Sequence, residues 1–333
     1  MSSGNTKYQK LPTSMNGSGD PESGKAASVE KRGPSKALIT FAIFFYATCS
    51  STMLVINKLA VYHVQAPSFV LFCQVAATAI AVYSASGAGL VKADPFEWEK
   101  MKAFFFVVAA FVAAIFTNMK TLQYANVETF IVFRSSTPLI ISVLEYMYLG
   151  RELPTLRSWA SLVAILCGAV GYMATDSGFE VRSYSWALAW FAVFSFDQVY
   201  IKHVCDTVEM TSWGRSYYTN LLGLPPVLFL MVVFQEWTVL EDQVWSAAAM
   251  GVLGLSCAIG VCMSYSAFLL RANVSATMFT VVGIMCKIGT VVINQVIWDK
   301  HASANGLAAL LVCLLAGTFY KQAPRRGERA GGK

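Results

Sequence analysis

The chain has 333 residues, of which 56% are hydrophobic and only 13% are charged, and its formal net charge is +6. This composition lies outside the range of soluble globular domains and indicates a membrane protein that crosses the bilayer several times. The excess of positive charge falls in predicted tails and loops, so it requires no nucleic-acid partner.

Residues 1–36 begin the chain as a segment rich in Ser, Gly, Thr and Lys. Such a segment cannot bury enough apolar surface to fold, so we expect a disordered cytosolic tail. The tail has no apolar region of the length that a signal peptide needs, and Asp20, Glu22 and Glu30 are atypical of an organelle transit peptide. We therefore expect no cleavable leader within it.

Ten apolar segments, each about as long as the bilayer core is thick, follow the tail. They cover about 38–57, 67–87, 103–122, 127–149, 157–174, 184–201, 213–234, 246–269, 275–297 and 304–320. The sequence thus predicts an all-α membrane protein, with a ten-helix transporter domain over 37–322 and a basic cytosolic tail over 323–333.

The basic residues of the tails and loops indicate how the chain is oriented. Eighteen of them fall on the side of the two termini, whereas the opposite side has only Lys58, Lys120, Arg182 and Lys300. Because cytoplasmic loops of membrane proteins are enriched in Lys and Arg, we expect both termini to be cytosolic.

A short internal repeat suggests two related halves. Ala125-Asn126-Val127, which opens the fourth segment, recurs as Ala272-Asn273-Val274 at the opening of the ninth, 147 residues later. Each copy is followed by an apolar span, a polar turn and a last span that ends in small residues and an aromatic. With five spans in each half, an odd number, repeats over about 37–175 and 184–321 must be inverted relative to each other.

Polar side chains inside apolar spans are the candidate substrate-binding residues, because inverted repeats place the substrate near the midplane between the halves. Lys287 is the clearest, since a cation near the centre of a membrane span costs about 2.5–3.5 kcal/mol and normally faces a cavity or a ligand. The full set of candidates is Tyr46, Asn57, Arg134, Tyr218, Thr219, Asn220, Ser264, Gly283 and Lys287.

Several polar or small residues also have plain structural interpretations. Arg134 has Glu128 before it and Glu145 after it, so an ion pair within the protein is an alternative to ligand contact. Asn57 can simply cap the end of the first span. Lys202, near the end of the sixth span, is expected to extend its ammonium group to the membrane surface. Small residues such as Gly168, together with Ala169 and Gly171, favour close helix packing.

The sequence shows no apparatus for catalysis or for binding a metal. Seven of the eight cysteines lie in predicted spans without metal-ligand spacing, and the three histidines fall near loop ends. No Ser/His/Asp or paired-carboxylate pattern lies on one predicted helix face. We therefore expect a protein that is not an enzyme and has no cofactor, metal site or disulfide framework.

Five runs of sequence are long enough to be specific to a family: NVETFIVFRSSTPL at 126–139, ATDSGF at 174–179, YSWALAW at 184–190, VYIKH at 199–203 and VVINQVIWDKHAS at 291–303. They resemble the nucleotide-sugar transporters of the drug/metabolite transporter superfamily, and among these the plant-type Golgi transporters of GDP-sugars. The resemblance covers about 38–322. It implies a ten-helix antiporter that imports a GDP-sugar, such as GDP-mannose, GDP-L-galactose or GDP-fucose, into the Golgi lumen in exchange for GMP by alternating access.

Two family motifs carry this resemblance to individual positions. The nucleotide motif FYNN falls on residues 217–220, here YYTN, and the motif GALNK falls on residues 283–287, here GIMCK. The resemblance implies that Asn220 hydrogen-bonds guanine and that Lys287 meets the diphosphate as a point charge. Thr219 replaces an amide of the family motif.

Further positions match the family, and others depart from it. Tyr46 and Ser264 match positions that line the sugar and nucleotide ends of the site, whereas Thr219 and Cys286 depart from the motifs. These departures leave open a UDP-sugar transporter of the same fold, a sugar-phosphate translocator, or a membrane scaffold or chaperone that no longer transports. The identity of the sugar also stays open, as does assembly into a homodimer in the lipid bilayer.

Overall fold

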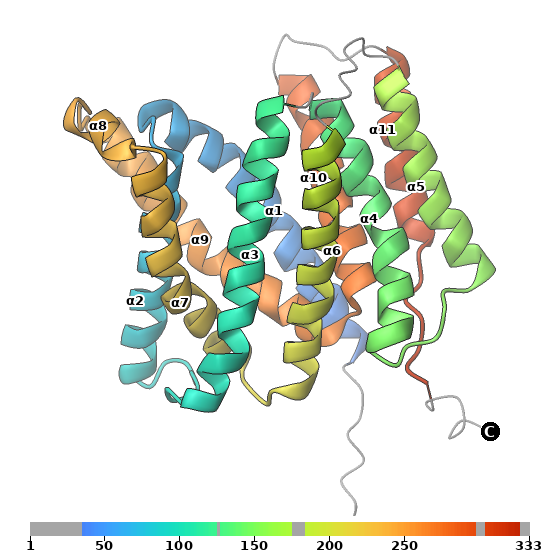
Figure 1. The fold of residues 1–333 in the computed structure, drawn as a ribbon, viewed down its shortest axis with the longest axis horizontal. Helices are drawn as coiled ribbons and strands as arrows, with labels where there is room; N and C mark the ends of the chain where they lie inside the picture. Colours follow the sequence, from blue (N-terminus) through green and yellow to red (C-terminus); the bar gives the residue numbers. More distant parts are fainter. Residues whose placement is uncertain (1–34, 125–126, 175–183, 298–303, 327–333) are drawn as a thin grey trace, which may run out of the picture. The chain divides into compact units, whose positions relative to one another are not determined.

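The computed structural model describes residues 35–124, 127–174, 184–297 and 304–326, so most of the predicted N-terminal tail over 1–36 lies outside the described residues. The described residues form eleven helices (Figure 1). Their bounds are α1 Lys36–His63, α2 Pro67–Gly87, α3 Trp98–Tyr124, α4 Val127–Tyr148, α5 Leu156–Ala174, α6 Tyr184–Thr207, α7 Ser212–Val233, α8 Glu236–Glu241, α9 Ala247–Asn273, α10 Ala276–Ile297 and α11 Ala304–Phe319.

Each of the ten predicted apolar segments is a helix, so the prediction of an all-helical chain is confirmed. The sequence did not predict α8, a short helix that follows Gln235, whose φ of 52° lies in the left-handed region. Among the described residues, α1, α2, α7 and α9 are long and apolar enough to cross a membrane. These helices identify a membrane protein.

Local sequence explains where several helices begin. Ser35, Thr211 and Ser246 precede α1, α7 and α9, and each hydroxyl accepts a hydrogen bond from the backbone N–H three residues later, at 3.2, 3.0 and 3.1 Å. Pro67 is the first residue of α2, where its missing N–H costs nothing. Satisfying these N–H groups matters more near a membrane, which offers little water to replace the caps.

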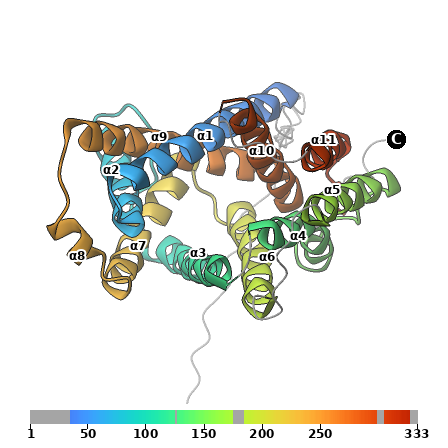
Figure 2. The same cartoon turned by 90° about the horizontal axis from the view of Figure 1, so that it is seen from above.

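The helices of the described unit pack in pairs that bring distant parts of the chain together. α1 lies against α9, α3 against α6, α2 against α7, α4 against α10 and α5 against α11. Figure 2, seen from above, shows α1 and α9 on the opposite side of the unit from α3 and α6. Each pair joins one helix from before residue 175 to one from after residue 183.

The α5–α11 pair is close because it is lined by small residues. A Cβ atom added at Gly168 would lie 2.5 Å from the Cys313 sulfur and 2.9 Å from the backbone oxygen of Ala309. The Ser161 hydroxyl donates to the backbone oxygen of Ala316 at 2.6 Å. The predicted role of small residues in helix packing is therefore confirmed at Gly168.

Residues 320–326, which follow α11, form a segment that we call the C-terminal strap. Its backbone pairs with the turn between α4 and α5: Glu152 N–H donates to the oxygen of Pro324 at 3.0 Å, and Arg326 N–H donates to the oxygen of Gly150 at 2.8 Å. The first residues of the predicted basic tail are thus docked on the helical unit.

Candidate functional site

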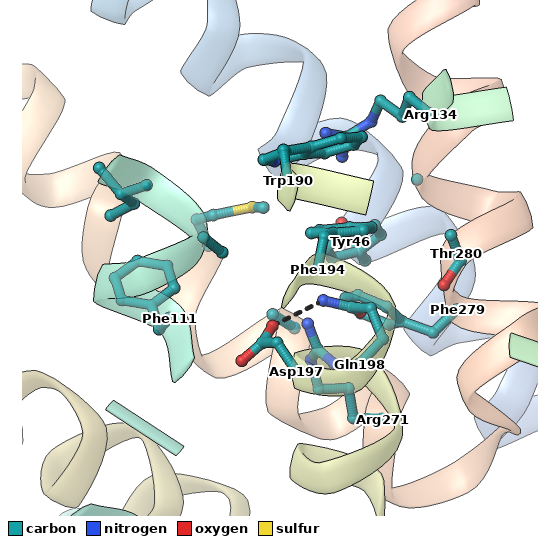
Figure 3. A pocket seen from close by; sticks show the side chains of 15 residues that line it. Tyr46, Phe111, Arg134, Trp190, Phe194, Asp197, Gln198, Arg271, Phe279 and Thr280 are labelled. Atoms are coloured by element: carbon teal, nitrogen blue, oxygen red, sulfur yellow. Dashed lines mark hydrogen bonds between the residues drawn. The ribbon is translucent and has the colours of Figure 1, made fainter. Parts of the chain in front are cut away.

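Two adjoining cavities lie inside the helical unit. The first, which we call the arginine cavity, has a volume of about 260 Å³ (Figure 3). Its polar and aromatic lining comprises Tyr46, Phe111, Arg134, Trp190, Phe194, Asp197, Gln198, Arg271, Phe279 and Thr280, with Gly283. The second, the amide cavity, has about 310 Å³ and includes Gln74, Thr78, Thr219, Asn220 and Ser264 in its lining. Both are lined by Phe111, Asp197, Met263, Ala267 and Arg271, so the two cavities meet there.

Arg134 reaches the arginine cavity from α4. Its guanidinium carbon lies 5.1 Å from the ring centre of Phe194 and 6.0 Å from that of Trp190, both on α6. Its Nε is buried without a hydrogen-bond partner. An arginine that lies near two aromatic rings and has an unsatisfied donor is suited to an anionic ligand.

The alternative ion pair between Arg134 and Glu145 is wrong, because the Glu145 carboxylate is used elsewhere. It accepts hydrogen bonds from the backbone N–H of Ala276 at 2.7 Å and the hydroxyl of Thr277 at 2.5 Å, at the start of α10. It also lies 3.4 Å from the Nε of Arg151. The side chain of Glu128, the other proposed partner, lies outside the described residues.

Arg271, from the last turn of α9, is the second cation of the site. Its guanidinium carbon lies 3.8 Å from the ring centre of Phe279, and its Nη1 is buried without a hydrogen-bond partner. Arg271 is one of the eighteen basic residues that the sequence assigns to the side of the termini, and it was not selected as a binding residue. Its side chain lines both cavities, and α9 continues four residues beyond the predicted end of its span.

Asn220 and Ser264 lie together in the amide cavity. The Asn220 amide nitrogen donates to the backbone oxygen of Ser216 at 2.7 Å and to the Ser264 hydroxyl at 2.8 Å. The hydroxyls of Ser216 and Ser264 lie 2.7 Å apart. Thr219 lines the same cavity, and its Oγ1 is buried without a hydrogen-bond partner.

Tyr46 and Gly283 lie together in the arginine cavity. The Tyr46 ring centre is 5.0 Å from that of Phe279, and a Cβ atom added at Gly283 would lie 3.5 Å from the Tyr46 hydroxyl oxygen. The tertiary structure therefore gathers six of the sequence candidates around the joined cavities: Tyr46, Arg134, Thr219, Asn220, Ser264 and Gly283.

Of the remaining three candidates, Tyr218 and Asn57 line neither of the two cavities. Tyr218 is fully buried, and its hydroxyl accepts from the N–H of Glu97 and donates to the oxygen of Pro95, each at 2.6 Å. Asn57 accepts from the side-chain amide of Gln74 at 2.8 Å, so it reaches the amide cavity only through that residue. Lys287 belongs to α10, but its side chain lies outside the described residues.

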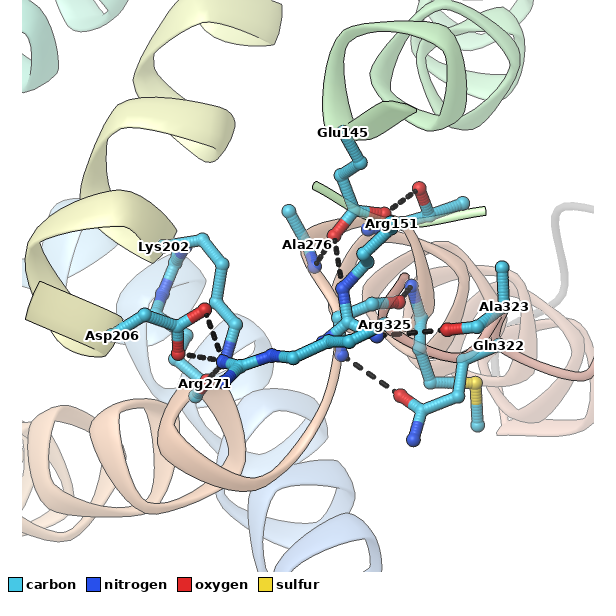
Figure 4. A network of polar contacts seen from close by, with 12 residues as sticks. Glu145, Arg151, Lys202, Asp206, Arg271, Ala276, Gln322, Ala323 and Arg325 are labelled. Carbon is cyan, nitrogen blue, oxygen red and sulfur yellow. Dashed lines mark hydrogen bonds and ion pairs between the residues drawn. The ribbon is translucent and has the colours of Figure 1, made fainter. Parts of the chain in front are cut away.

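Lys202 does not extend to the membrane surface as predicted. Its side chain is 3% exposed, and its ammonium lies 2.8 Å from Asp206 and donates to the backbone oxygen of Arg271 at 2.8 Å. Asp206 also pairs with Arg325 of the C-terminal strap at 2.8 Å (Figure 4). A carboxylate one helical turn away and a nearby carbonyl hold this lysine inside the protein.

Sequence reasoning did not select the residues that α6 contributes. Trp190, Phe194, Asp197 and Gln198 recur on one side of this helix and line the arginine cavity. The signal was present, because Asp197 is an acid within an apolar span, and such residues mark internal cavities. Among the described residues, no group of three or more His, Cys, Asp or Glu side chains is suited to a metal ion.

Comparison with known proteins gives the fold and the family. No protein-family model matches the sequence. A solved crystal structure of a protein that is 15% identical aligns with a TM-score of 0.67, over 86% of this chain and 96% of that one. At this identity the likeness supports the helical fold alone.

Curated relatives are much more similar in sequence. GDP-fucose transporter 1 of Arabidopsis thaliana is 41% identical over 284 residues, which are 83% of this chain and 83% of the relative. GDP-mannose transporter GONST3 of the same plant is 35% identical over 83% of this chain and 76% of its own length. A GDP-mannose transporter of the yeast Meyerozyma guilliermondii is 24% identical over 90% and 91%. Because it is 41% and 35% identical to the two Arabidopsis transporters over 83% of its length, the chain belongs to the family of nucleotide-sugar transporters.

Proposed function

We propose that the protein is a Golgi antiporter that imports a GDP-sugar into the lumen and returns GMP by alternating access. The observation that carries the proposal is the pair Arg134 and Arg271, which line one buried cavity from α4 and α9. Each keeps a buried N–H group without a partner. The relatives named as GDP-fucose and GDP-mannose transporters give the class of anion that such a cavity takes.

The proposal includes ten membrane-spanning helices arranged as two inverted repeats, α1–α5 and α6, α7, α9, α10 and α11. The helix contacts support it, because they occur as matched sets. α1 packs on α9 as α6 packs on α3, α1 on α10 as α6 on α4, α2 on α9 as α7 on α3, and α4 on α5 as α10 on α11. An exchange of the two halves converts each of these contacts into its counterpart, as expected for a pseudo-two-fold axis.

Within the joined cavities we assign the guanine base to the amide cavity, with Thr219, Asn220 and Ser264. The diphosphate then lies against Arg134 and Arg271, joined by Lys287 as the family motif implies. These cations hold phosphate oxygens by charge-assisted hydrogen bonds.

The sugar is assigned to the end of the arginine cavity near Tyr46 and Gly283. Gly283 supports this assignment because it places no side chain beside the Tyr46 hydroxyl, whereas an added Cβ atom would lie 3.5 Å from the hydroxyl oxygen. Tyr218 has no assigned contact with the substrate, and Asn57 positions Gln74 rather than touching the ligand.

Obligatory exchange follows from the cost of occluding an empty site. The buried and unpaired atoms Arg134 Nε, Arg271 Nη1 and Thr219 Oγ1 find partners only when an anionic nucleotide is bound. Closing the cavity without one would leave each of them unsatisfied, at about 1–3 kcal/mol per group and more for the charged ones. The loaded carrier therefore reorients faster than the empty one, and GMP fills the return step.

We propose that the protein spans the Golgi membrane with both termini in the cytosol. The distribution of basic residues, 18 on the side of the termini and four opposite, supports this orientation. Glycosylation of Asn16 or Asn273, both in N-x-S sequons, would contradict it, because glycosylation occurs in the lumen.

The test is uptake by proteoliposomes preloaded with GMP, against a panel of labelled GDP-sugars and UDP-sugars. We expect uptake of at least one GDP-sugar that depends on internal GMP, is lost in Arg134→Ala and Lys287→Ala, and persists in Lys102→Ala, a matched control on the exposed start of α3. Uptake of UDP-sugars alone would overturn the choice of base. If the unaltered protein takes up no nucleotide sugar, the result would favour the alternative that the protein is a membrane scaffold that does not transport.

A further inference from the structure

Asp197 is a buried carboxylate at the point where the two cavities meet. It is 5% exposed and lines both cavities from α6. Its Oδ2 accepts a hydrogen bond from the side-chain amide of Gln198 at 2.9 Å, whereas its Oδ1 is buried without a hydrogen-bond partner. The Gln198 Oε1 is buried and unpartnered as well. Two buried acceptors of residues that line the arginine cavity thus make no hydrogen bond in the described structure.

A buried carboxylate without compensation would be too costly to keep. Arg271 lines the same two cavities and supplies the opposite charge, and Figure 3 shows Asp197, Gln198 and Arg271 at one end of the arginine cavity. The Arg271 guanidinium is held against Phe279 at 3.8 Å. The charge of Asp197 is therefore balanced while its Oδ1 stays available to a ligand donor.

The amide cavity adds a further acceptor. Both N–H groups of the Asn220 amide are used, by the oxygen of Ser216 and by the hydroxyl of Ser264. The group that Asn220 offers a ligand is then its amide oxygen. Asp197 at the junction and Asn220 in the amide cavity thus both offer acceptors, so the ligand edge that fits between them is one with several neighbouring N–H donors.

Guanine has such an edge, because its N1–H and its 2-amino group lie side by side. Uracil has a single N–H between two carbonyl oxygens, which a carboxylate would repel. Adenine presents its amino group beside an unprotonated ring nitrogen, which a carboxylate would also repel. A site built to accept hydrogen bonds from particular donors strongly rejects analogues that lack them.

We propose that Asp197 is the specificity-determining residue for guanine: its carboxylate accepts hydrogen bonds from the N1–H and 2-amino groups of the base. This inference rests on the proposed transport of GDP-sugars and adds a residue to it. Arg271 places a positive charge at the same junction, and Gln198 fixes the orientation of the carboxylate through its 2.9 Å hydrogen bond.

The first test uses the unaltered protein in proteoliposomes. Unlabelled GMP, IMP and XMP compete for uptake of whichever labelled GDP-sugar is transported. IMP lacks the 2-amino group and XMP carries an oxygen in its place, so each is expected to compete at least about tenfold more weakly than GMP, the effect of one lost hydrogen bond to a charged group. Equal inhibition by GMP and IMP would overturn the proposal, and this result depends on no variant.

The second test is Asp197→Asn, whose amide N–H can donate to the 2-oxygen of xanthine. We expect the ratio of XMP to GMP inhibition to shift by at least about tenfold toward XMP. Asp206→Asn removes a carboxylate from the same helix but outside both cavities, and we expect it to keep the wild-type order of bases. An unchanged order in transport-competent Asp197→Asn protein would overturn the role of Asp197.

The outcomes distinguish this inference from the proposed function. Wild-type protein that takes up no GDP-sugar defeats the proposed function itself. Wild-type protein that takes up a GDP-sugar but does not distinguish GMP from IMP defeats only the role of Asp197. If Asp197→Asn does not fold, the relative inhibition of wild-type uptake by GMP and IMP tests the inference, and equal inhibition overturns it.

Discussion

Asp94 and Glu236 cap opposite ends of the same helix pair, α2 and α7. Asp94, which follows α2, accepts hydrogen bonds from the N–H and the hydroxyl of Thr211 at the start of α7, both at 2.8 Å. Glu236, which follows α7, accepts from the N–H groups of Ser68 and Phe69 at the start of α2, at 2.9 and 2.8 Å. Each helix is thus followed by the carboxylate that binds the N-terminus of the other, where the helix dipole favours negative charge.

The first prediction concerns Glu236. Glu236→Gln removes the charge and one of the two strong acceptors from the start of α2, so we expect the free energy of unfolding to fall by about 1–3 kcal/mol. Thermal unfolding of the detergent-solubilised protein measures this change. Glu241→Gln, on the same short helix but exposed, is the matched control and should leave the Tm unchanged. Equal Tm values for the two variants would contradict the capping role.

The second prediction separates Tyr218 from the neighbouring binding residues. Because its hydroxyl bridges Glu97 and Pro95 outside the cavities, Tyr218→Phe should lower stability by about 1–2 kcal/mol and leave the KM for the GDP-sugar unchanged. Asn220→Ala should instead raise the KM, because Asn220 lines the amide cavity. Thermal unfolding and initial uptake rates measure the two effects. A raised KM in Tyr218→Phe would contradict this prediction and show that the Tyr218 hydroxyl contributes to substrate binding.

The third prediction concerns the C-terminal strap. The carboxylate of Asp206 lies 2.8 Å from Arg325 of the strap and 2.8 Å from Lys202. Asp206→Asn weakens both ion pairs, so the strap should open more often and trypsin should cleave after Lys321, Arg325 or Arg326 several-fold faster than in the wild type. Mass spectrometry of the released C-terminal peptide gives the rate. Asp242→Asn, exposed at the end of α8, is the control, and equal cleavage rates would show that this pair does not hold the strap.

The fourth prediction compares two glycines in helices. Gly168→Ala places a Cβ 2.9 Å from the backbone oxygen of Ala309, which cannot move freely, so we expect a loss of about 1–3 kcal/mol of stability. Gly251→Ala, in α9, meets nothing within 4 Å and should stabilise by about 0.5–1 kcal/mol. The Tm of the two variants should therefore move in opposite directions. A loss at both positions would point to general intolerance of these helices rather than to close packing at α5–α11.

The sequence predicts an inverted arrangement from a short repeat, and the residues of that repeat show how far such a signal reaches. Val127 opens α4 and Asn273 ends α9 at the two copies, but residues 125–126 lie outside the described residues. The repeat relates the fourth predicted span to the ninth, but it does not predict that they touch. The contact between these two helices, α4 and α10, depends on how the two halves pack together. Sequence patterns report periodicity along one chain, not the interface between its parts.

The sequence by itself determined where the helices lie, because runs of about 20 apolar residues have few other ways to satisfy their backbone. It also nominated Arg134 and Asn220, polar residues too costly to place in lipid. Only the tertiary structure decided that Asp197 and Arg271, 74 positions apart in the chain, line the same two cavities, and that Tyr218 turns away from them. The direction of a side chain depends on helix rotation and on the partner helix, and neither is written in local composition.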